Sequence, residues 1–252
     1  MPERHSLLTR WLGVGLAASL SVVTLGLAAT GRIGLYINPD SAWFAVGMAV
    51  LTLVGAAASF VLPLGAEDDH GHDHDHDHAS SRARGAGLGR AATVAGGVLA
   101  TALVLGMLVL PPASLSAELA ASRDVGTAPL FAGADTVALA TQGDTSAFGV
   151  GDWASVFATA TDPGSFDGEA VTLTGFVGPG DADGFALTRL VITHCVIDAQ
   201  AAAVPVAGAE TSFAAGQWVT VAGTVHTAPG GGLEILASEI TAVDEPAEPY
   251  EY

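Results

Sequence analysis

Residues 41–65 read SAWFAVGMAVLTLVGAAASFVLPLG and contain no charged side chain. A helix needs about 20 residues to cross the hydrocarbon core of a bilayer, and this stretch is longer than that. Because lipid offers backbone N–H and C=O groups no hydrogen-bond partners, such a segment must be helical. The stretch therefore predicts a transmembrane helix.

Two further uncharged stretches, Leu12–Thr30 and Ala91–Ser116, flank it. Half of all residues are hydrophobic and only 13% are charged, whereas soluble domains have about 25% charged residues. We therefore expect three transmembrane helices and a multi-pass membrane protein. Arg4 and Arg10 precede the first stretch, so a cleaved signal peptide is an alternative for that stretch alone.

The arginines predict the orientation, because the chain has no lysine. Membrane proteins place an excess of arginine and lysine in their cytoplasmic loops. Near the ends of the three spans, two arginines lie on one side, Arg32 and Arg123. Five lie on the other side, namely Arg4, Arg10, Arg82, Arg84 and Arg90. The rule places the N-terminus and the second loop in the cytoplasm and the C-terminal half outside.

The predicted outer half is strongly acidic. From Pro112 onward it has 18 Asp and Glu residues and two arginines, Arg123 and Arg189, which gives −16 of the formal net charge of −18. Such a surface repels nucleic acid and anionic lipid heads and tolerates cationic partners. We exclude nucleic-acid binding on this ground. The simplest interpretation of the acidity is a solvated surface that keeps the domain soluble.

The composition divides the chain into three parts. Residues 1–111 form a transmembrane region with a His/Asp-rich loop at 66–90, and residues 112–150 read as a linker that begins with a Pro pair. Residues 151–252 begin with a short helix, for which Asp152 is the expected N-cap. They continue with strands rich in Val, Thr and Ile, separated by Gly-rich turns. A small all-β, OB-like barrel is the most economical prediction for this C-terminal domain.

Two of the expected strands resemble each other. Residues 171–177, VTLTGFV, match residues 219–225, VTVAGTV, at the Val, Thr, Gly and Val positions. In each, the first, third and last residues point to one face of the strand. The shared glycine marks a bend or a close approach of another backbone.

These landmarks resemble a known family. LPPASLS after the last span, GDWASVF, VTLTGFV, RLVITHCVIDA and QWVTVAGTV are similar to successive motifs of the YcgQ-like family of bacterial membrane proteins, described as permease accessory subunits. The resemblance implies a plasma-membrane location, a larger multi-span permease as partner and, for some members, a link to metal homeostasis. This chain has His194-Cys195 where the family tends to have two adjacent cysteines, which keeps a metal ligand but removes dithiol redox chemistry.

Three interpretations of the only cysteine, Cys195, are compatible with the sequence. It could bind a transition metal with His194 and Asp198, since thiolate and imidazole suit zinc or copper. It could be a nucleophile, although no catalytic spacing accompanies it. It could be a small buried hydrophobe in phase with Val191. In a continuous strand His194 and Cys195 would face opposite sides, so one ion could hold both only at a bulge or turn. A site that includes His226 from another strand is conceivable.

The second loop carries the stronger metal signal. Its residues 67–81 read EDDHGHDHDHDHASS, in which histidine and aspartate alternate. The predicted ligands are His70, His72, His74, His76 and His78. Neutral imidazoles bind Zn²⁺, Ni²⁺, Cu²⁺ or Co²⁺, and carboxylates can support them as hydrogen-bond acceptors. A loop this polar must be ordered by binding, so we expect a weak site for several ions. A solvated loop without a role is the alternative.

From the sequence we expect an accessory subunit of a permease that is linked to divalent transition-metal handling and is not an enzyme. The predicted spans contain no ionisable residue, so they offer no polar pathway of their own through the membrane. The alternative is an envelope interaction module whose outer domain binds a protein or glycan, with no role for metal.

Overall fold

The computed structural model describes residues 3–61, 95–104, 106, 114–115, 145–180, 184–208 and 213–252. The chain divides into two compact units. One comprises Met1–Ile33 and Asp40–Pro112, and the other comprises Gly34–Pro39 and Ala113–Tyr252. The short connection between the first two helices therefore belongs to the C-terminal unit. The boundaries expected from the sequence stay predictions.

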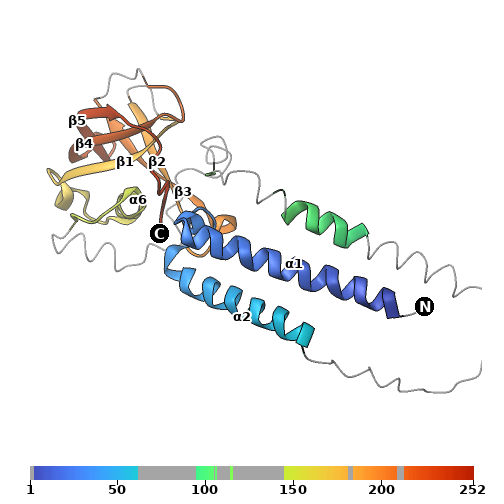
Figure 1. Cartoon of the computed structure of the whole chain (residues 1–252). Helices are drawn as coiled ribbons and strands as arrows, with labels where there is room; N and C mark the ends of the chain where they lie inside the picture. The colour runs from blue at the N-terminus through green and yellow to red at the C-terminus, as the bar shows by residue number, and fades with distance from the viewer. Residues whose placement is uncertain are drawn as a thin grey trace, which may run out of the picture. The chain divides into compact units, whose positions relative to one another are not determined.

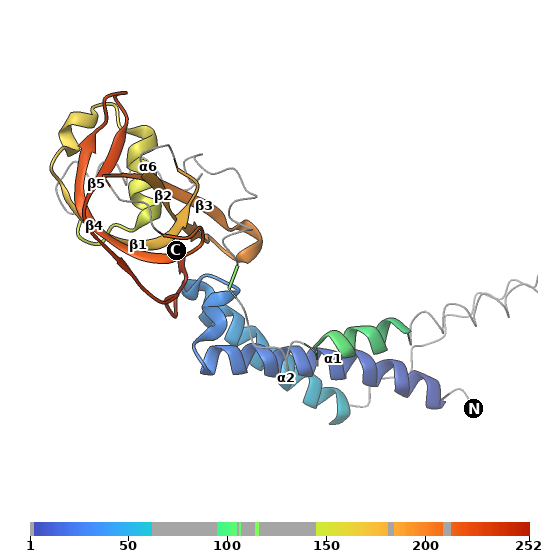
Figure 2. The same ribbon diagram turned by 90° about the horizontal axis from the view of Figure 1, so that it is seen from above.

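The helical unit contains α1 (Glu3–Ala29) and α2 (Ala42–Val61), which lie side by side (Figures 1 and 2). Two short 3₁₀ helices, η1 (Arg32–Leu35) and η2 (Pro39–Ser41), occupy the connection between them. Large apolar side chains point outward from α2, above all Trp43, which is 76% exposed. The others on α2 are Phe44, Met48, Val50, Leu51 and Val54. A helix whose apolar side chains face its surroundings is typical of a membrane span.

The hydroxyl groups of these helices are compatible with lipid. Among the side chains that the structure describes, Ser21 Oγ donates to the backbone carbonyl of Ala17, about one turn earlier, at 2.9 Å. The same bond is made by Ser19, Thr24, Thr52 and Ser59. These side chains therefore need no water to satisfy their donors.

The prediction of three spans is not confirmed. Among the described residues, one helix, Pro39–Ser59, is long and apolar enough to cross a membrane, with a mean hydropathy of 1.8. Within the described residues, Gly13–Ala29 of α1 is a shorter apolar helix. The third predicted span is described over Ala95–Val104 and at Gly106, and the rest of it lies outside the described residues, apart from two positions near its end.

The C-terminal unit contains a closed five-stranded β-barrel (Figure 1). Its strands are β1 (Ala170–Gly178), β2 (Gly184–Val191), β3 (Gln200–Ala207), β4 (Trp218–Thr227) and β5 (Leu233–Ala242). The order is β1-β4-β5-β3-β2, and β2 pairs with β1 again to close the barrel. All pairs are antiparallel except β3 with β5. The predicted small β-barrel is thus confirmed.

The two similar segments pair with each other. β1 and β4 run antiparallel with Val171 opposite Gly223 and Gly175 opposite Val219, so each shared glycine faces the first valine of the other segment. A Cβ at Gly175 would lie 2.6 Å from the carbonyl oxygen of Thr188, and the strand has a bulge beside Gly223. Both glycines therefore mark close approaches or bends, as predicted.

The barrel interior is filled by side chains. Leu187, Val204, Val219, Val221 and Ile235 are fully buried there. Helix α6 (Val150–Thr159) packs chiefly on β3 and β2 (Figure 2). Its Trp153 is 1% exposed and joins the same core.

A second apolar cluster lies apart from this core. It contains Phe176, Leu190 and Ile192 together with Tyr250 of β6 (Tyr250–Glu251), a short strand parallel to β2. Leu35, from the connection between α1 and α2, packs against the same cluster. The C-terminus and the interhelical connection therefore cover apolar surface that strands β1 and β2 would otherwise expose.

One local prediction is corrected, and one strand was missed. The helix near residue 152 exists, but it begins at Val150, and Asp152 at its third position accepts a hydrogen bond from the N–H of Gly149 at 3.1 Å. Strand β3 was not predicted, because its sequence QAAAVPVA is rich in alanine, which favours helices. In the barrel, the small side chains of Ala201 and Ala202 are buried.

Candidate functional site

The turn that contains Cys195 begins where β2 ends, at Val191. Residues 192–195 leave the strand and η4 (Val196–Asp198) follows. The strand therefore ends before His194 and Cys195. One ion could contact both side chains only at such a turn. We call residues Thr193–Asp198 the Cys195 turn.

The carboxylate of Asp198 holds this turn together. It accepts hydrogen bonds from the backbone N–H groups of Thr193 (3.1 Å), His194 (2.9 Å) and Cys195 (3.2 Å). Its Oδ2 also lies 3.3 Å from Nδ1 of His194. Partial desolvation raises the pKa of Asp198, but the hydrogen bonds from Cys195, His194 and Thr193 outweigh it and lower that pKa. Asp198 is therefore a structural anion at neutral pH.

The predicted ligands of this turn, His194, Cys195 and Asp198, are close in sequence, and their role as metal ligands stays a prediction. The His194 side chain is 77% exposed and Cys195 is half-buried with a free thiol. Within the part of the chain that the structure describes, no group of three His, Cys, Asp or Glu residues could hold a metal ion. His226 instead pairs with Asp167, with Nδ1 3.0 Å from Oδ1. The five predicted loop ligands, His70 to His78, lie outside the described residues.

The Cys195 turn is joined to the connection between α1 and α2. Ile37 and Cys195 form an antiparallel β-bridge. The N–H of Val196 donates to the carbonyl of Tyr36 at 3.0 Å. Asn38 donates two hydrogen bonds, both at 3.0 Å. Its backbone N–H donates to the carbonyl of His194, and its side-chain amide donates to the backbone carbonyl of Thr193. The interhelical connection thus pairs with this turn as a short added strand.

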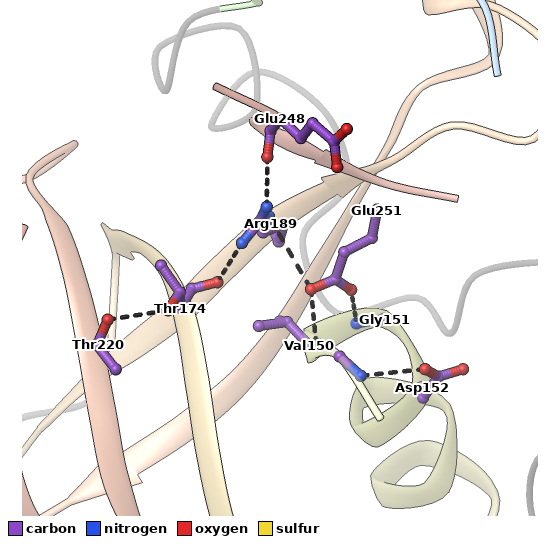
Figure 3. Close-up of polar contacts among 9 residues, drawn as sticks. Val150, Gly151, Asp152, Thr174, Arg189, Thr220, Glu248 and Glu251 are labelled. Atoms are coloured by element: carbon purple, nitrogen blue, oxygen red, sulfur yellow. Dashed lines mark hydrogen bonds and ion pairs between the residues drawn. The ribbon is translucent and has the colours of Figure 1, made fainter. Parts of the chain in front are cut away.

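Arg189 is the centre of a second polar cluster, which we call the C-terminal clasp (Figure 3). Its guanidinium donates to the carbonyl oxygens of Thr174 at 2.8 Å and Glu248 at 2.6 Å. It also lies 5.3 Å from the centre of the Trp218 ring, within the range of a cation–π contact. Its Nε is 3.9 Å from the carboxylate of Glu251. Arg189 therefore connects β1 and β4 to the C-terminal segment.

Glu251 completes the clasp at the start of helix α6 (Figure 3). Its two carboxylate oxygens accept the N–H groups of Val150 (2.9 Å) and Gly151 (2.6 Å). These N–H groups have no partner inside the helix, and the helix dipole favours a negative charge there. Burial raises the pKa of Glu251 despite these bonds and the charge of Arg189. Burial also lowers the pKa of Arg189, and Glu251 partly offsets this.

The sequence interpretation missed this clasp. Arg189 and Glu251 are far apart along the chain, and neither belongs to a motif. One signal was present, because Arg189 and Arg123 are the only basic residues other than histidine in the acidic half. A single arginine within a strand of a domain with so many carboxylates indicates a buried ion pair.

Two family models match the chain. The DUF1980 N-terminal domain covers residues 15–126 and the DUF1980 C-terminal domain covers residues 151–252. The chain belongs to the DUF1980 family. The resemblance stated from the sequence is thus confirmed at the level of a family of domains of unknown function. The YcgQ-like name and the permease partner of this DUF1980 protein stay predictions.

No curated protein matches this DUF1980 chain. Among solved structures, a match is the OBody AM1L10 bound to hen egg-white lysozyme, at 20% identity and a TM-score of 0.23. The match covers 32% of this chain and 84% of that chain.

Proposed function

We propose that this DUF1980 protein is an integral accessory subunit of a multi-span permease in a bacterial plasma membrane. Its three predicted spans anchor the chain with the N-terminus in the cytoplasm, and its barrel lies outside the cell. The observation that carries the proposal is the outward exposure of large apolar side chains along α2, from Trp43 at 76% to Met48 at 45%. In water such a surface would be costly, whereas in lipid or against a partner helix it is favourable.

The barrel is an OB-like domain in this proposal, and its role is contact with other molecules. A β1-β2-β3-β5-β4 order that closes on β1, with β3 parallel to β5, supports this assignment. Leu187 and Val204 are 0% exposed in a filled interior. A filled barrel presents its outer face, which favours a docking role over an enzymatic one.

The loop at residues 66–90 supplies the link to divalent transition-metal ions, with Zn²⁺ as the first candidate. Five alternating histidines among eight in the whole chain support this part of the proposal. The loop would gather or sense ions on the cytoplasmic side for the permease. This role of the loop requires no metal centre in the barrel.

The test is purification of the tagged full chain from its native membranes, with mass spectrometry of co-purifying proteins and elemental analysis. We expect a multi-span permease and bound divalent metal. Replacing all five loop histidines, His70, His72, His74, His76 and His78, by alanine should remove most of the metal. A variant with the five loop aspartates replaced by asparagine is the matched control, and it should keep more metal than the histidine variant. Unchanged metal in the histidine variant would refute the loop's role.

One observation favours the alternative class, an envelope module that binds a protein or glycan. Within the described residues of the barrel, no group of three His, Cys, Asp or Glu residues could hold a metal ion, and the Asp198 carboxylate is bonded to backbone N–H groups. A permease association that depends on added metal would support the accessory subunit. An association that ignores metal and persists in the histidine variant would support the interaction module.

A further inference from the structure

The Cys195 turn presents an unusual apolar side chain. Ile197 is 85% exposed, more than any other large hydrophobic residue in the described parts of the chain. It lies within η4, whose end is fixed by the hydrogen bonds of Asp198 to three preceding N–H groups.

The chain itself limits where this turn can lie. Ile37 pairs with Cys195, and Asn38 donates to the carbonyls of Thr193 and His194. The next residue, Pro39, is the first residue of the candidate span Pro39–Ser59. Two residues reach at most about 7 Å, and paired backbones lie about 5 Å apart. Cys195 is therefore within roughly 12 Å of the beginning of the span, whatever the orientation of the barrel.

The side chains at this place suit a lipid interface. Tyr36, 39% exposed, precedes the span, and Trp43, 76% exposed, lies in its first turns. Aromatic residues favour the level of the lipid headgroups. Because the outer half carries −16 of the net charge, anionic lipid heads would repel it. Any attraction between the turn and the membrane must therefore be apolar, and Ile197 is the most exposed large apolar side chain of the turn.

We propose that the Cys195 turn rests on the outer surface of the lipid bilayer and inserts Ile197 among the lipids at the interface. The inference depends on the proposed function, since it requires Pro39–Ser59 to cross the membrane. The partner is the bilayer itself.

The test uses the full chain in phosphatidylcholine vesicles, with Cys195→Ser to remove the native thiol. Serine keeps the backbone N–H that donates to Asp198. An environment-sensitive fluorophore is attached to Ile197→Cys, to Leu236→Cys as an exposed barrel control (47% exposed) and to Phe44→Cys as a span control (58% exposed). Quenching by lipids that are brominated near the headgroup end of the acyl chains is then measured.

We expect quenching at position 197 to exceed that at position 236 by roughly twofold or more, with a blue-shifted emission. Equal quenching at 197 and 236, together with strong quenching at 44, would overturn the inference and leave the span intact. Absence of quenching at 44 would instead overturn the proposed membrane function. If the probe at 197 is shielded only when a co-purified permease is added, the turn binds protein and the inference is wrong.

Folding of each variant is checked by its thermal unfolding midpoint. If the Cys195→Ser chain does not fold, a photoreactive amino acid at position 197 in the native background replaces the fluorophore. It should then crosslink to lipid, and crosslinking to protein alone would contradict the inference.

Discussion

At the scale of single residues, Asp198 does most to define the predicted site. The sequence singled it out as a metal ligand, and the structure gives its carboxylate to three backbone N–H groups. This carboxylate therefore has a structural role in the turn, and its role as a metal ligand stays a prediction. Its position three residues after Cys195 is explained by the turn, in which an acid at the third helical position bonds back to the residue before the helix.

Replacing Asp198 by alanine should lower the free energy of unfolding by about 1–3 kcal/mol, because three N–H groups lose a shared acceptor. The measurement is chemical denaturation of the full chain in detergent, followed by circular dichroism. Asp244→Ala is the matched control, since Asp244 is an exposed acid of the same domain. Equal stability of the two variants would show that the bonds to Asp198 do not stabilise the turn.

At the scale of elements, α6 and β6 connect the two ends of the barrel domain. Trp153 of α6 makes edge contacts with Phe148, Phe157 and Phe166, with ring centres 5.7, 6.0 and 6.4 Å apart. Glu251 of β6 holds the first N–H groups of the same helix. The helix is thus fixed by apolar packing on one side and by a charge at its beginning.

Replacing Trp153 by alanine should destabilise the barrel by about 3–5 kcal/mol, the usual cost of removing a large buried aromatic side chain. Trp153→Phe is the matched control and should lose less, because it keeps a ring in the same place. Thermal unfolding of both variants measures the difference. A Trp153→Ala chain as stable as Trp153→Phe would mean that α6 does not contribute to the core.

The clasp predicts a pH dependence of defined sign. Burial raises the pKa of Glu251, so the folded chain holds this proton more tightly than the unfolded chain. The group's contribution to the free energy of unfolding is therefore largest below its ordinary pKa and decreases as the pH rises through the raised pKa. Parent and Glu251→Gln chains are compared by denaturation between about pH 4 and pH 7.

The stability of the parent relative to Glu251→Gln should fall as the pH increases over this range. Any pH effect of the other carboxyl groups is common to both chains and cancels in the comparison. A relative stability that rises with pH would show that the bonds from Val150 and Gly151 and the charge of Arg189 outweigh the effect of burial.

The elements differ in how well their sequences predicted them. β1 and β4 were predictable because Val and Thr alternate in both, and the paired glycines mark the bends. β3 was not, because alanines fit a crowded barrel wall yet favour helices when considered locally. The clasp depends on Arg189 and Glu251 meeting across the fold, which no local pattern encodes. The metal site at Cys195 stays a prediction, and the sequence did not indicate that Asp198 accepts the backbone N–H groups of the turn.

At the scale of the whole molecule, two kinds of surface occur in one chain. The helices expose apolar side chains such as Trp43 and Leu51, whereas the C-terminal half carries most of the negative charge. Each half matches a DUF1980 domain model. The proposal assigns the first surface to lipid and the second to the water outside the cell, and the accessory role depends on this division.

The most direct test is the accessibility of two introduced cysteines to a membrane-impermeant maleimide on intact cells, in a Cys195→Ser chain. One is Asp244→Cys in the barrel, and the other is Ala86→Cys in the predicted cytoplasmic loop. We predict labelling at 244 before the cells are opened and at 86 only afterwards. Labelling at 86 on intact cells, or at 244 only after lysis, would contradict the orientation on which the proposal rests.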